Sequence, residues 1–113
     1  MQLFTIERVD HTENTYIFKA TLEPSHKIFE GHFPQRPVVP GVCTMDMIKR
    51  CCAVIMSKEV RFDTIKEVKF LATILPSQHH ELDVIIELKE EMNISVLVKS
   101  EDTTMMKLKA TLI

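Results

Sequence analysis

Glycine is scarce in this chain: only Gly31 and Gly41 occur among its 113 residues, and one short stretch contains both. The stretch reads Gly-His-Phe-Pro-Gln-Arg-Pro-Val-Val-Pro-Gly and also holds three of the chain's five prolines. Glycine adopts backbone angles closed to other residues, whereas proline fixes φ near −65°. We therefore expect a stiff and unusual backbone path that presents His32 directly ahead of a helix.

Cysteine is also uncommon, and the number of cysteines is odd. Cys43, Cys51 and Cys52 are the three, and two of them are adjacent, which does not resemble a disulfide framework. Their spacing does not suit zinc, so no metal site is expected. The segment after Met1 lacks the charged and apolar regions of a signal peptide. The cysteines are thus expected to be reduced, in a cytoplasmic protein.

Long apolar runs and an excess of basic charge are both missing. The longest strictly apolar run, Cys51–Met56, is far shorter than the roughly 20 residues of a membrane-spanning helix. A net charge of −2 does not match the basic footprint of a nucleic-acid-binding protein. A mass of 13.1 kDa predicts a single domain over residues 1–113, with a core thin enough that burial against a second subunit would help.

Hydrophobic periodicity predicts one helix among several strands. The segment Val42–Met56 lacks glycine and proline and predicts a helix, whose apolar second half implies burial on all sides. Alternation of apolar and polar residues predicts antiparallel strands that are wet on one face. The expected strands are about Leu3–Val9, Thr15–Leu22, Thr64–Leu75, 81–89, 94–99 and 106–112. The predicted fold class is α+β, with a curved antiparallel sheet wrapped around one long helix.

Two titratable residues stand out as candidates for chemistry. His32 has an ordinary pKa near neutrality and sits on the stiff stretch, while Asp46 lies about one turn inside the helix. The start of the helix, near Gly41 and Val42, offers unpaired backbone N–H groups to an oxygen that gains negative charge. A base, a carboxylate and such donors together suggest proton removal next to a carbonyl, with loss or gain of water.

Simpler interpretations compete with this one. A lone histidine in a loop is more often structural or exposed than catalytic. Asp46 stands four residues before Arg50 and three before Lys49, and the pattern alone favours an ordinary ion pair on the helix surface, first of all with Arg50. Several other candidates are most simply core or surface residues: the cysteines as inert core thiols, and Lys66, Lys69, Lys107 and Lys109 as the wet face of strands.

The stretch from Gly31 to Val42, followed by Asp46, closely resembles the motif of the bacterial β-hydroxyacyl-acyl-carrier-protein dehydratases. In that family a Gly-His-Phe-Pro turn leads through Pro-x-x-Pro-Gly into a central helix, and an acidic residue follows the histidine by fourteen positions, as Asp46 follows His32. A weaker similarity runs from Lys69 to Pro76, so the resemblance covers nearly the whole chain.

The resemblance implies a hotdog fold and a lyase that dehydrates 3-hydroxyacyl thioesters to trans-2-enoyl thioesters, with no metal or diffusible cofactor. It implies a homodimer or dimer-based oligomer with shared active sites. His32 of one subunit would take the C2 proton, and Asp46 of the other would protonate the departing hydroxyl. Backbone N–H groups of Val42 and Gly41 would polarise the thioester carbonyl, and Phe33 would line an acyl tunnel. The Phe33–Pro34 peptide is expected to be cis.

The chain departs from the family motif in places. It lacks the extra helix that many members carry ahead of the first strand, and Pro76-Ser77-Gln78 replaces the usual Pro-Gly-Asp turn. Arg50 stands where the family usually has glutamine, and a cation there would favour ionised Asp46, a poor proton donor.

The partner implied by the resemblance is an acyl carrier protein, or coenzyme A, that bears the substrate. Because acyl carrier proteins are acidic, a basic entrance is expected, with Arg36, Lys49, Arg61 and Lys66 as candidates. Two other functions remain open: a hotdog thioesterase, and a non-catalytic acyl-binding subunit that pairs with an active hotdog protein.

Overall fold

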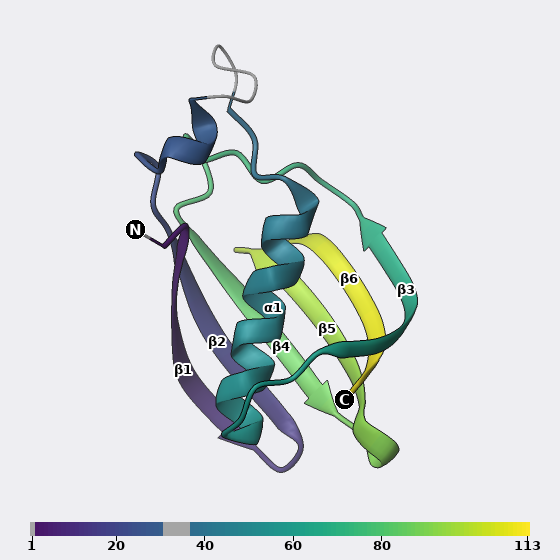
Figure 1. Ribbon diagram of the computed structural model, residues 1–113. Helices are drawn as coiled ribbons and strands as arrows, with labels where there is room; N and C mark the ends of the chain where they lie inside the picture. Colours follow the sequence, from purple (N-terminus) through teal and green to yellow (C-terminus); the bar gives the residue numbers. More distant parts are fainter. Residues whose placement is uncertain (1, 31–36) are drawn as a thin grey trace.

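The computed structural model describes residues 2–30 and 37–113, which form one antiparallel sheet and one long helix (Figure 1). The sheet order is β1-β2-β4-β5-β6-β3, so β1 and β3 are its two edges. The elements are β1 (Phe4–Thr12), β2 (Thr15–Leu22), the 3-10 turn η1 (Lys27–Phe29), α1 (Gly41–Met56), β3 (Phe62–Phe70), β4 (Glu81–Leu88), the 3-10 turn η2 (Glu90–Met92), β5 (Asn93–Ser100) and β6 (Thr103–Leu112). The predicted α+β fold class is confirmed.

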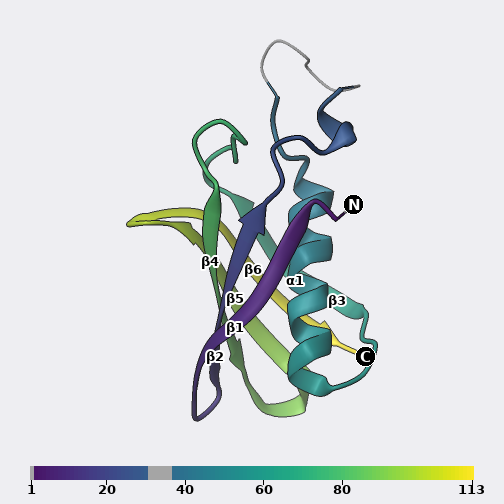
Figure 2. The same cartoon turned by 90° about the vertical axis from the view of Figure 1, so that its left-hand side faces the viewer.

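The alternation in the sequence corresponds to the two faces of the sheet. Phe18, Val84 and Val98 are fully buried on the face that packs against α1. Lys19 lies opposite Asp83 in register, and both belong to the other face. Figure 2 shows α1 against one face of the curved sheet, and no helix of the described residues lies on the opposite face. The core therefore lies between the inner face and α1.

The helix α1 begins after Pro40, whose extended backbone (φ −60°, ψ 141°) precedes the first turn. It ends at Met56 and is followed by Ser57 in the left-handed conformation. The expectation that its second half is buried on all sides is wrong. Cys51 and Cys52 are buried, but Val54 is 46% exposed, because one sheet can cover only one stripe of the helix. Within residues 2–30 and 37–113, no helix is long and apolar enough to cross a membrane.

The strand β3 ends at Phe70, whereas the sequence predicted a strand as far as Leu75. The N–H groups of Leu71 and Ala72 both donate to Met105 O, at 2.9 and 3.2 Å, so the ladder with β6 becomes irregular there. Ile74 O instead accepts a 2.9 Å hydrogen bond from Val39 N–H. The segment after β3 thus leaves the sheet and holds the residues that lead into α1.

Candidate active site

Asp46 lies in the second turn of α1, with a side chain that is 63% exposed. Its Oδ1 is 3.6 Å from Lys49 Nζ, so the predicted surface ion pair is present, with the partner at i+3. An exposed ion pair of this kind contributes about 0–1 kcal/mol to stability. The contact therefore leaves the carboxylate accessible.

Arg50 does not form the ion pair with Asp46 that the sequence favoured. Its guanidinium donates to Phe4 O at 2.8 Å and to Gln2 Oε1 at 2.9 Å. The i+4 spacing would allow a pair with Asp46, but the guanidinium reaches the Phe4 carbonyl of β1 and the Gln2 side-chain amide instead. Arg50 thus ties α1 to the start of the chain.

Two cavities meet at Asp46, and Arg50 lines both of them. The smaller, about 280 Å³, lies between α1 and the segments around β1 and η1. The larger, about 740 Å³, is a charged groove that contains two of the four predicted basic residues, Lys49 and Arg61. Lys66 lines a different cavity, and Arg36 lies outside the described residues. A ligand could thus approach the Asp46 carboxylate beside basic side chains, in a groove that Glu59 also lines.

The start of α1 supplies backbone donors near Asp46. Cys43 N–H and Thr44 N–H donate to Pro40 O at 3.0 and 3.4 Å, whereas Gly41 N–H and Val42 N–H have no backbone acceptor within the described chain. The Val42 side chain is 73% exposed and lines the smaller cavity together with Asp46, four residues later. Donors and a carboxylate in this arrangement can polarise a carbonyl oxygen and exchange a proton with the same ligand.

Phe70, which the sequence assigned only to a strand, covers the other side of the helix start. A Cβ atom added to Gly41 would lie 2.7 Å from Phe70 Cζ, so the absence of a side chain at position 41 allows the ring to approach. Gly41 and Phe70 line a third cavity of about 360 Å³, together with Thr44 and residues of β6. An aromatic residue at a strand end carried no signal that could have predicted this contact.

His26 is a second residue that the sequence analysis missed. Its Nδ1 accepts a 3.0 Å hydrogen bond from Ile28 N–H and caps η1, and its side chain lines the smaller cavity with Asp46. Phe29 and Val39 are buried and fix the described chain on both sides of residues 31–36. His32, Phe33 and the Phe33–Pro34 peptide fall within 31–36, outside the described residues, so their roles and the cis peptide stay predictions.

The cysteines are poor nucleophiles in this setting. Burial raises the pKa of the Cys51 and Cys52 thiols to about 12. Burial, and after it the negative charge of Asp46, raises the pKa of the Cys43 thiol. Among residues 2–30 and 37–113, no three His, Cys, Asp or Glu side chains gather where they could hold a metal ion.

Comparisons with known proteins agree on a dehydratase family. The model of the ApeI-like dehydratases matches residues 8–109. The 3-hydroxyacyl-acyl-carrier-protein dehydratase FabZ of Rickettsia canadensis is 31% identical over 83 residues, which cover 74% of this chain and 55% of that protein. The chain thus spans about half the length of the curated relatives it matches.

Solved structures share the fold. The dehydratase heterocomplex ApeI:P from Xenorhabdus doucetiae superposes with a TM-score of 0.79 at 23% identity, over 94% of this chain and 93% of that one. The dehydratase domain of the CurK module of Curacin polyketide synthase gives a TM-score of 0.64 at 14% identity, over 98% of this chain and 43% of that one. The expected hotdog fold is confirmed.

Proposed function

The chain belongs to the ApeI-like dehydratase family, and from this we infer that it dehydrates 3-hydroxyacyl thioesters to trans-2-enoyl thioesters. The observation that carries the proposal is the accessible carboxylate of Asp46, which shares a cavity with Val42 one turn earlier, whose N–H has no backbone acceptor within the described residues. A hydro-lyase needs a proton donor for the departing hydroxyl and donors for the thioester oxygen, and these groups provide both.

In the proposed reaction, an imidazole nitrogen of His32 takes the C2 proton of the substrate. The electron pair of that C–H bond becomes the C2–C3 double bond, and the C3–O bond breaks. Asp46 gives its proton to the departing hydroxyl, which leaves as water. Val42 N–H, and Gly41 N–H beside it, donate to the thioester oxygen while negative charge builds up there. Phe33 lines the path of the acyl chain.

We propose that each site takes His32 from one chain and Asp46 from another. The support is the exposed edge of the sheet at β3, on the right in Figure 1. Ile65 and Phe70 of β3 are 45% and 56% exposed along this edge, and Leu71 directly after the strand is 53% exposed. Such exposure is unusual for large apolar side chains at the edge of a sheet. Pairing of β3 with β3 of a second copy would cover them. The larger groove beside Asp46 would take the carrier, because Lys49 and Arg61 complement an acidic partner.

The direct test is the formation of enoyl absorbance from a 3-hydroxyacyl-carrier-protein or a surrogate thioester. The proposal predicts turnover by the wild-type protein and none by His32→Ala. Release of free thiol without enoyl product would instead identify a thioesterase. Absence of both products for every chain length would contradict catalysis by this chain alone.

A second candidate is a subunit that acts only in a mixed complex. The observation in its favour is the similarity to a chain of the ApeI:P heterocomplex, which is by its name an assembly of two different proteins. Activity that appears only after a second hotdog protein is added would support this candidate. Mixing with His32→Ala would then tell whether this chain supplies catalytic residues to the mixed site.

A further inference from the structure

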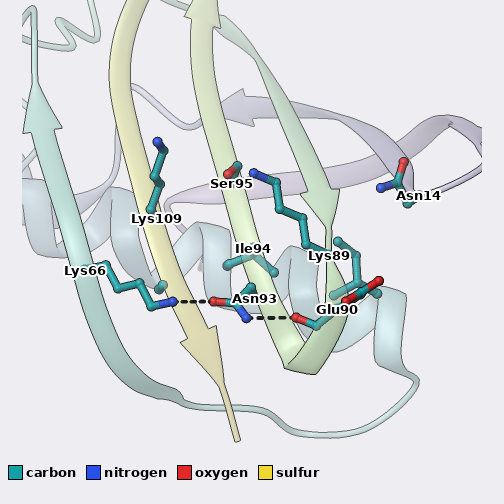
Figure 3. A pocket seen from close by; sticks show the side chains of 10 residues that line it. Asn14, Lys66, Lys89, Glu90, Asn93, Ile94, Ser95 and Lys109 are labelled. Atoms are coloured by element: carbon teal, nitrogen blue, oxygen red, sulfur yellow. Dashed lines mark hydrogen bonds between the residues drawn. The ribbon is translucent and has the colours of Figure 1, made fainter.

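A cavity far along the sheet from the start of α1 carries lysines that the proposed reaction does not use (Figure 3). It has a volume of about 780 Å³ and lies where η2 joins β4 to β5. Ser95 and Lys109 are direct partners in the β5–β6 ladder and alternate with buried Ile94 and Ala110, so they face away from α1. The lining residues are Asn14, Lys66, Leu88, Lys89, Glu90, Asn93, Ile94, Ser95, Lys109 and Ala110.

Lys66 is held in this cavity by a neutral group. Its Nζ donates a 2.6 Å hydrogen bond to Asn93 Oδ1, and Asn93 Nδ2 donates to Glu90 O at 2.8 Å. The second bond fixes the orientation of the amide, so the carbonyl oxygen points to the lysine (Figure 3). No carboxylate of the described residues forms an ion pair with Lys66, so its ammonium group is available to a ligand.

Lys109 is likewise not neutralised. Glu67 lies opposite Lys109 in the ladder with β6, but Glu67 Oε1 pairs with Lys69 Nζ at 3.3 Å instead. No carboxylate of the described residues forms an ion pair with Lys109.

The remaining charges of the cavity are Lys89 and Glu90. Lys89 Nζ lies 3.5 Å from Glu87 Oε1, in an exposed pair that water screens. Glu90 is the one acidic residue among those that line the cavity, and Figure 3 shows its carboxylate directed away from Lys66 and Lys109. The cavity therefore has an excess of positive charge, brought together from β3, β6 and the end of β4.

We propose that this cavity, here called the lysine pocket, binds a phosphate group. Three ammonium groups around one cavity match a group that carries more than one negative charge, and lysine binds phosphate as a point charge. The Asn14 amide and the Ser95 hydroxyl add neutral donors for phosphate oxygens. The ligand could be a free or nucleotide phosphate, or the phosphate that links a pantetheine arm to its carrier; the phosphate is common to both.

The test is a titration of the full-length protein with inorganic pyrophosphate at low ionic strength, followed by amide NMR shifts. Saturable shifts are expected at Asn93 and Ser95. The double variant Lys66→Gln/Lys109→Gln should bind about tenfold or more weakly, because it loses two charge-assisted contacts. The control is Lys99→Gln/Lys107→Gln, which removes the same charge from half-buried Lys99 of β5 and exposed Lys107 of β6. Neither residue lines the pocket, so binding should stay within about twofold of the wild type.

Equal weakening in both double variants would show general attraction to a basic surface and would overturn the proposal, as would the absence of saturable shifts. Thermal unfolding of each variant verifies that it remains folded. The same variants titrated with coenzyme A and with a phosphopantetheine-bearing carrier identify the source of the phosphate, since binding of the true ligand depends on Lys66 and Lys109. None of these measurements uses turnover, so a negative result for the lysine pocket would not count against the dehydratase proposal, and the reverse also holds.

Discussion

The carboxylate of Asp46 pairs with Lys49 Nζ at 3.6 Å, on the exposed side of α1, while Arg50 turns away to Phe4 O. The sequence favoured an ion pair between Asp46 and Arg50, but in the structure the two side chains have different partners. Asp46 remains accessible to a ligand in either neighbouring cavity. Arg50, which the sequence suggested as the cation that controls Asp46, instead has a structural contact.

Replacing Asp46 should therefore slow the reaction strongly, whereas replacing its ion-pair partner should not. We expect Asp46→Asn to lower the rate of enoyl formation by about 100-fold or more, since a positioned acid or base contributes 10²–10⁴-fold. Lys49→Gln, which removes only an exposed pair, should keep the rate at low ionic strength within about threefold when a small surrogate thioester replaces the carrier. Equal losses in the two variants would contradict the assigned role of Asp46.

Arg50→Gln tests the contact between α1 and β1. The variant loses the hydrogen bonds to Phe4 O and Gln2 Oε1 and should be less stable by about 1–2 kcal/mol in urea unfolding. Lys49→Gln is the matched control and should change the free energy of unfolding by less than about 0.5 kcal/mol. A stability for Arg50→Gln equal to that of the wild type would show that these bonds contribute nothing.

The contact between Gly41 and Phe70 predicts coupling between the two positions. Gly41→Ala should destabilise the protein because the new Cβ would lie 2.7 Å from Phe70 Cζ and displace the ring. In a Phe70→Ala background the same substitution should be neutral or stabilising, with a coupling energy of about 1 kcal/mol in a double-mutant cycle. Additive effects would mean that the ring moves aside at no cost.

The buried thiols predict a loss of stability at alkaline pH. The folded protein holds the protons of Cys51 and Cys52 up to about pH 12, whereas an unfolded thiol ionises near its ordinary pKa of 9.0. Between these values the unfolded state binds fewer protons, so the free energy of unfolding falls as pH rises above 9. Thermal melts from pH 7 to 10.5 should show this fall, with a shallower slope for Cys51→Ala/Cys52→Ala. Identical slopes for the two proteins would contradict the assignment.

Most of the fold could be predicted from the sequence because most strands and the helix depend on the pattern of their own residues. Strands such as β5 alternate between core and water, and α1 lacks both glycine and proline over nearly its whole length, so each element follows from its own residues. The end of β3 was missed because its continuation, as far as Ile74, depends on contact with Val39 across the fold.

The site was predictable only in part, for the same reason. The position of Asp46 and the ion pair with Lys49 follow from helical spacing. The partner of Arg50 is a carbonyl 46 residues away, and the lysine pocket combines residues of four strands and two connections. Such long-range contacts have no counterpart in the local pattern.

The measurement that tests the central claim most directly is complementation between two inactive variants. His32→Ala and Asp46→Asn should each fail to form enoyl product as pure proteins. After unfolding and refolding together, half of the dimers contain one copy of each, and one of their two sites has both groups, so about a quarter of wild-type activity should return. No recovery, in a mixture shown to form mixed dimers, would contradict a site built from two chains.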